Sequence, residues 1–205
     1  MSETGVLDGL QLVGGRPCLD FINTEGLERN GPPERLPSYE ALVQWSVLVG
    51  VIDQAAADRL IRGATRSGSA AANVLERAVE LREAMYRIFA ATIDGTTPTK
   101  ADRAILDVEL GRALAHLRAV PADQKWDWQF VDGDELDSIL WPLTRDAADL
   151  LTSRDIDRMR ECSGTNCAWL FVDQSRNRSR RWCDMAECGN RSKARRFYRR
   201  QKGGA

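Results

Sequence analysis

Four cysteines in the last quarter of the chain constrain its fold more than any other sequence feature. They form two pairs with equal gaps, Cys162-SGTN-Cys167 and Cys183-DMAE-Cys188, separated by fifteen residues. Structural zinc sites use four tetrahedral ligands, and two short loops can each turn a pair of thiolates toward the same ion. The spacing therefore predicts one structural zinc ion held by these four cysteines.

Other uses of these thiols remain open at this point. Cys18 stands alone far upstream and makes the number of cysteines odd, which argues against a disulfide framework. A site with four sulfur ligands also accepts iron, and the same thiolates could act as a redox switch. Cys18 lies beside apolar Leu19 and Phe21, so we expect it to be a small core residue.

The residues around the cysteines predict a module that depends on its metal. About 45 residues bury too little apolar surface to fold alone. We expect Trp169 to Val172 to pair with Arg181 to Cys183 as a hairpin whose polar turn is 174–179. A cysteine pair, a hairpin and a second pair leading into a helix after Cys188 is the order of a treble-clef-like module.

The C-terminal segment is strongly basic. Residues 156–205 hold 13 Lys and Arg against 5 Asp and Glu, a net charge of +8, whereas residues 1–155 carry -9. The run after Cys188 places Ala194, Phe197 and Tyr198 on one helical face between two rows of basic side chains. The residues predicted to contact nucleic-acid phosphates are Arg176, Arg178, Arg180, Arg181, Arg191, Lys193, Arg195, Arg196, Arg199 and Arg200.

The first 155 residues read mainly as helices. Ser38 is a candidate N-cap for an apolar-periodic segment that runs to Ile52, and Asp53 is a candidate cap for the next helix. Residues 70–93 carry the clearest helical stripe, with Asp94-Gly95 as its stop.

A further helix should follow Pro98 and precede a hairpin. Its apolar residues are Ala101, Ile105, Val108 and Leu110. The segments LAHLRAV and KWDWQFV, separated by 121–124, should form the two arms of the hairpin.

Two other N-terminal expectations concern backbone breaks. We expect the segment before and after Gly14-Gly15 to be extended, and Pro142 to bend a helix after Trp141. The predicted fold class is mainly α with some β (α+β): residues 1–155 form a helical domain with a small hairpin, and 156–205 form the four-cysteine zinc module.

Several partners fit this pattern. Arginine outnumbers lysine in the basic segment, which favours phosphate and guanine contacts, and double-stranded DNA is the preferred partner. RNA is the second possibility, aided by Trp169, Phe171 or Trp182 if they are exposed. The third is a protein-interaction module, in which the basic helix docks on an acidic protein or on the chain's own acidic domain.

A ligand site in the N-terminal domain has weaker support. Trp126 and Trp128 in the hairpin, and Asp20, Asn23 and Thr24 after the apolar run, could line a pocket. Packing and turn capping explain the same residues more simply. The sequence therefore leaves the ligand, if any, unknown.

We expect no catalytic activity and no membrane span. His116 is the only histidine, so no His-based triad or two-histidine metal centre is possible, and neither phosphate-binding glycine motif occurs. No basic start followed by an apolar run opens the chain. We therefore expect a cytoplasmic protein.

The same residues resemble a known family. Cys188-Gly189-Asn190-Arg191 is the motif that names the CGNR zinc-finger proteins, and the stretch from Cys162 to Arg196 is similar to that finger without a gap. Leu19 to Thr24 and Leu81 to Ala84 resemble the family's partner domain, called ABATE. The resemblance implies a stress-associated bacterial transcription regulator, and two DNA-gripping modules in a homodimer would increase its affinity.

Overall fold

The structure is mainly helical, which confirms the expected fold class. This computed structural model describes residues 11–25, 34–123, 125–131 and 134–202, without the side chains of 200 and 202. The elements of the first part are α1 (Pro17–Ile22), α2 (Tyr39–Leu48), α3 (Gln54–Arg66), α4 (Gly68–Ile93), α5 (Lys100–Ala115), β1 (Leu117–Ala122), β2 (Lys125–Phe130), η2 (Leu136–Leu140) and α6 (Trp141–Thr152). The remaining elements are η3 (Arg154–Arg158), β3 (Met159–Glu161), β4 (Leu170–Val172), the one-turn helix η4 (Met185–Gly189) and α7 (Asn190–Lys202).

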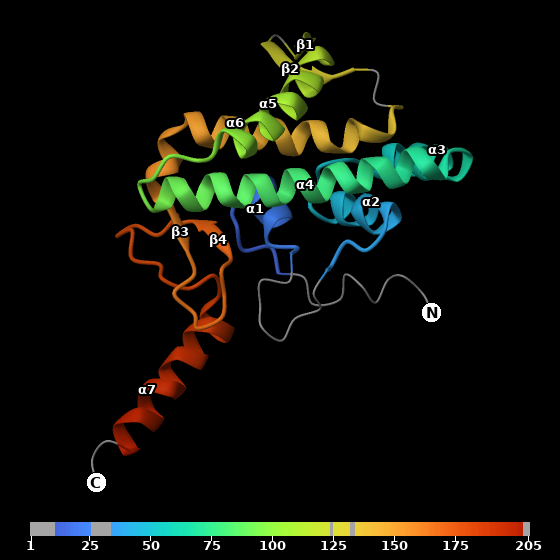
Figure 1. Cartoon of the computed structure of the whole chain (residues 1–205). Helices are drawn as coiled ribbons and strands as arrows, with labels where there is room; N and C mark the ends of the chain where they lie inside the picture. Colours follow the sequence, from blue (N-terminus) through green and yellow to red (C-terminus); the bar gives the residue numbers. More distant parts are fainter. Residues whose placement is uncertain (1–10, 26–33, 124, 132–133, 203–205) are drawn as a thin grey trace.

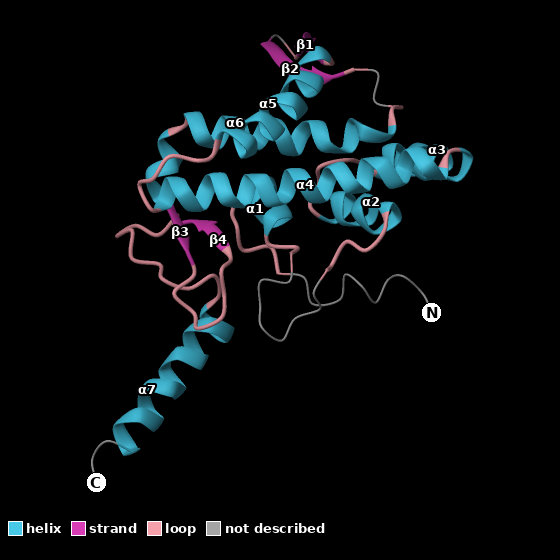
Figure 2. Cartoon of the chain, viewed as in Figure 1, coloured by secondary structure: helices cyan, strands magenta, loops and turns pink. Residues whose placement is uncertain are grey.

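Helix α4 is the central element of the body. It runs for 26 residues and buries Val74, Ala78, Leu81 and Met85 along one stripe. Helices α5 and α6 lie on one side of it and α1 and α2 on the other (Figures 1 and 2). The predicted helix is confirmed, and Gly95, with a positive φ of 68°, follows its end.

Both predicted N-caps are confirmed. The Ser38 hydroxyl accepts a hydrogen bond from the backbone N–H of Ala41, and the Asp53 carboxylate accepts one from Ala56. Helix α2 ends at Leu48, however, so the periodicity that ran on to Ile52 overestimated its length.

The expected extended segment is wrong after Gly15. Pro17 lies in the first turn of α1, where its missing N–H costs no helical hydrogen bond. Cys18, Leu19, Phe21 and Ile22 are all buried, because α1 packs against neighbours on more than one side. A short run that is apolar all round cannot be assigned to strand or helix by periodicity.

The predicted helix after Pro98 is confirmed as α5, but the apolar residues named for it are not the residues that it buries. Ala101 and Val108 face solvent, whereas the buried residues are Asp102, Leu106, Glu109 and Ala113. The two acids can be buried because arginines of α4 pair with them. Arg87 contacts Asp102 at 2.7 Å and Arg77 contacts Glu109 at 2.7 Å.

The predicted hairpin is confirmed, with shorter arms. Strands β1 and β2 pair antiparallel, with Leu117 opposite Phe130 and Ala122 opposite Lys125. His116 lies at the end of α5 instead of in a strand, and its ring stacks on Trp141 at 3.9 Å. Both hairpin tryptophans are exposed.

Pro142 begins a helix instead of bending one. It lies in the first turn of α6, directly after η2, where proline is favoured. No helix within the described part of the chain combines the length and apolar character that crossing a membrane requires.

Candidate metal centre and basic helix

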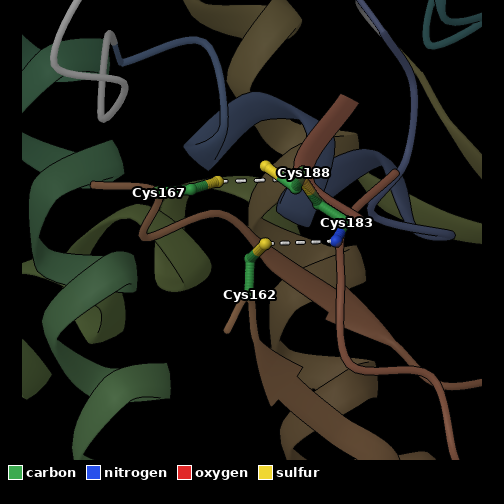
Figure 3. A group of neighbouring side chains, drawn as sticks. All are labelled: Cys162, Cys167, Cys183 and Cys188. Atoms are coloured by element: carbon green, nitrogen blue, oxygen red, sulfur yellow. Dashed lines mark hydrogen bonds between the residues drawn. The ribbon is translucent and has the colours of Figure 1, made fainter. Parts of the chain in front are cut away.

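The four cysteines meet at one point, as Figure 3 shows. Their sulfur atoms all lie within 4.8 Å of one another, and all four residues are buried. The Cys167–Cys183 and Cys183–Cys188 sulfur pairs are each 3.7 Å apart. A tetrahedron with Zn–S bonds of about 2.3 Å has S–S edges of about 3.8 Å, so the side chains already have the spacing of a zinc site.

The chain reaches this centre through four local structures. Cys162 follows β3, Cys167 ends a tight turn before β4, Cys183 lies in a loop and Cys188 lies in η4. The backbone N–H groups of Gly164 and Cys183 each donate to the Cys162 sulfur at 3.3 Å. Such donors stabilise a thiolate.

Ionisation of all four sulfurs together requires a cation. Hydrogen bonds from Cys167 and Cys183 lower the pKa of Cys162 to about 2. The hydrogen bond that Cys167 makes with Cys162 raises the pKa of Cys167 to about 12. The hydrogen bonds of Cys183 with Cys162 and Cys167 raise the pKa of Cys183. Without a cation only part of the group can ionise, whereas a divalent metal allows all four thiolates to form.

The hairpin predicted inside the module paired Trp169 to Val172 with the wrong segment. Strand β4 pairs with β3, with Met159 opposite Val172 and Glu161 opposite Leu170. Residues 181–183 form a loop, which contacts the turn 162–167 through hydrogen bonds from Ser163 N to Arg181 O and from Cys183 N to the Cys162 sulfur.

Asp173 explains why the segment after β4 turns instead of pairing. Its carboxylate accepts from the backbone N–H of Ser175 at 2.9 Å and of Arg180 at 3.0 Å. Burial alone would raise the pKa of Asp173, but these hydrogen bonds outweigh burial and lower it. The ionised side chain therefore closes the loop 174–180.

Arg180, one of the predicted phosphate contacts, instead holds the module together. Its guanidinium donates to the carbonyls of Trp182, Cys183 and Val13, and lies 4.2 Å from the centre of the Phe171 ring. These four contacts give Arg180 a structural role instead of the predicted contact with phosphate.

The other predicted contacts are open to solvent. Arg176, Arg178 and Arg181, in and directly after the loop, are all exposed. On α7, Arg191, Lys193, Arg196 and Arg199 are exposed, Arg195 is half-buried, and the side chain of Arg200 lies outside the described residues. Arg191 is 3.9 Å from Glu187, a weak exposed pair.

The module is joined to the body by contacts that sequence reasoning missed. Val172 N donates to Gly14 O at 2.9 Å, and the side chain of Gln11 donates to Glu187 at 3.1 Å. Val13 packs against the cysteine cluster. No motif or periodicity in residues 11–14 marks this role, because the contacts arise only when two distant parts of the chain pack together.

Three of the five residues considered for a ligand pocket have structural roles, and the other two are the exposed tryptophans of the β1–β2 hairpin. Asn23 is buried and exchanges two hydrogen bonds of 2.9 Å with the backbone of Leu170 in β4. Burial raises the pKa of Asp20 to about 6, even though its carboxylate accepts from Gly14 N at 2.8 Å. The Thr24 hydroxyl accepts from buried Arg82 at 3.0 Å.

Comparison with protein families agrees with this geometry. Residues 15–154 match the ABATE family, described as "Putative stress-induced transcription regulator", and 158–201 match the CGNR zinc finger. No curated protein matches the chain. The matched finger and the sulfur spacing together show one structural zinc ion, bound by the four cysteines. The chain belongs to the ABATE family and carries a CGNR zinc finger at its C-terminal end.

Proposed function

We propose that this protein is a cytoplasmic, non-catalytic transcription regulator that binds double-stranded DNA through its zinc module. One observation carries the proposal: α7 presents a row of basic side chains that the rest of the described chain leaves uncovered. Lys193, Arg195, Arg196 and Arg199 make no ion pair with any described residue. Four thiolates and Zn²⁺ add -2 to the module, which leaves it at about +6.

Two of the alternatives lose part of their support. Docking of α7 on its own acidic domain requires a covered helix, whereas Figure 1 shows α7 projecting away from the other helices. Single-stranded RNA binding relied on exposed rings in the module, but Trp169 and Phe171 are buried and Trp182 is half-buried. Within the described part of the module, the exposed rings are Phe197 and Tyr198 of α7.

Fluorescence anisotropy of the zinc-loaded full-length protein on mixed-sequence duplex DNA tests the proposal. We expect binding at low salt that weakens by about 0.9 log unit per phosphate neutralised for each decade of salt. Replacing Arg195 and Arg196 with Ala should weaken binding about tenfold or more. The matched control is Arg62→Ala with Arg66→Ala, which removes two exposed arginines from α3.

The control variant should bind as the unmodified protein does. An equal loss of DNA affinity in both double variants would show that the effect comes from net charge alone. Absence of binding at low salt would overturn the proposal, and preference for a single-stranded RNA of the same length would replace it with the RNA alternative.

A further inference from the structure

An open groove on the body has apolar and acidic walls. It lies between α4 and α5, has a volume of about 340 Å³, and includes Glu80, Ala104, Ile105 and Val108 in its lining. Val108 is 54% exposed, which is high for a valine on a packed helix. Ile105 and Val108, two of the apolar residues that the sequence placed on α5, thus line this groove.

The adjoining face of α4 is also apolar and acidic. Leu75, Glu76, Val79, Glu80 and Glu83 line a second hollow that shares Glu80 with the first. The three acids recur at four- and three-residue spacing, so they follow one face of the helix. Glu76 and Glu80 make no ion pair among the described residues, whereas Glu83 makes a loose, exposed pair with Arg87 at 3.4 Å.

The basic side chains within the groove are already neutralised. Arg77 and Arg112 both contact Glu109, and Arg77 also contacts Asp137 at 2.9 Å. The unpaired charge that the groove offers to a partner is therefore acidic.

Helix α7 has the complementary surface. Ala194, Phe197 and Tyr198 form an apolar strip at three- and four-residue spacing, and the two rings are 60% and 64% exposed. Arg195 and Arg196 flank that strip. A helix of 13 residues is about 20 Å long, and it points away from the body that carries the groove.

We propose that the α4–α5 groove receives α7 of a second copy of this chain, in a reciprocal exchange that forms a dimer. An amphipathic helix in an apolar groove is an established recognition mode, with anchors at i, i+3 and i+4. The arginines of α7 would meet Glu76 and Glu80, whereas two α7 helices packed on each other would bring like charges together. Reciprocal exchange makes the contact twice per dimer.

Arg195 and Arg196 cannot contact Glu76 and Glu80 and DNA phosphates at the same time, so the dimer is proposed for the DNA-free protein. Sedimentation equilibrium of the zinc-loaded full-length protein without DNA, at low and high salt, tests the proposal independently of DNA binding. We expect a dimer that weakens as salt rises. Val108→Glu, Glu80→Arg and Arg196→Glu should each weaken the dimer about tenfold or more. Asp155→Arg reverses an exposed acid outside the groove and should leave the dimer intact.

Complementary charge reversals provide the most specific arm of the test. In a mixed dimer of the Glu80→Arg and Arg196→Glu proteins, one contact joins the two reversed charges and the other keeps the original pair. An equimolar mixture should therefore form dimers where neither protein dimerises alone. Zinc content and far-ultraviolet circular dichroism would show that each variant is folded. A monomer at every salt concentration would overturn the proposal. A dimer whose dissociation constant is unchanged by Val108→Glu and Glu80→Arg would also overturn it.

Discussion

Gly164 shows how closely a single residue can be tied to the metal centre. It lies in the turn between Cys162 and Cys167, and its N–H donates to the Cys162 sulfur. A Cβ atom built at this position would lie 2.9 Å from the Cys188 sulfur and 3.2 Å from the Cys162 sulfur. Both distances are shorter than ordinary van der Waals contact, and the sulfurs cannot move without disturbing the ion.

We therefore predict that Gly164→Ala lowers zinc affinity by about 10- to 100-fold, the range seen when groups next to metal ligands are changed. Competition with a chromogenic chelator measures this affinity. Gly111→Ala is the control, because its Cβ atom meets nothing within 4 Å on α5. Unchanged zinc affinity in Gly164→Ala would show that the turn relaxes around the methyl group.

At the residue scale, the metal ligands were predictable and the role of Arg180 was not. Thiolate spacing is local, so sequence distance alone indicates which cysteines can share an ion. The guanidinium of Arg180 donates hydrogen bonds to three carbonyls, those of Val13 near the N-terminus and of Trp182 and Cys183 beside the metal centre. Its sequence context, a run of arginines in a polar loop, is indistinguishable from that of Arg178.

At the scale of elements, the hairpin β3–β4 links the module to the body. Met159, Leu170 and Val172 belong to the same hydrophobic core as the body helices. Asn23, in the turn after α1, fastens β4 by donating to Leu170 O and accepting from Leu170 N. A buried amide that makes both of these hydrogen bonds contributes more to the free energy of unfolding than an exposed amide does.

Asn23→Ala should accordingly lower the free energy of unfolding by about 2 kcal/mol or more, because the Leu170 N–H and carbonyl lose a buried partner. Urea denaturation of the zinc-loaded protein measures the change. Asn177→Ala in the exposed loop provides the comparison and should stay within about 0.5 kcal/mol of the unmodified protein. Equal stabilities for the two variants would contradict the role assigned to Asn23.

Most helix positions followed from periodicity and capping residues, whereas α1, the strand partners in the module and the buried face of α5 did not. Residues 181–183 suit a strand as well as 159–161 do, and the loop closed by Asp173 decides between them. Asp102 and Glu109 are buried only because arginines of α4 meet them. Such choices depend on tertiary contacts, which short-range patterns do not contain.

At the scale of the whole molecule, charge and metal act on the same helix. The acidic body and basic module carry nearly equal and opposite charges, and α7 bears much of the positive charge away from the body. Cys188 lies in η4, the turn that leads directly into α7. Zinc therefore fixes the start of the helix that we propose binds DNA.

The central claim is that the zinc-ordered module, not the body, binds DNA. The most direct measurement is duplex DNA anisotropy before zinc removal, after extraction with a chelator, and after zinc is restored, with circular dichroism recorded alongside. We predict that binding is lost and then recovered while most of the helical signal persists, because the body helices contain no metal ligand. DNA binding that survives complete removal of zinc would contradict the account.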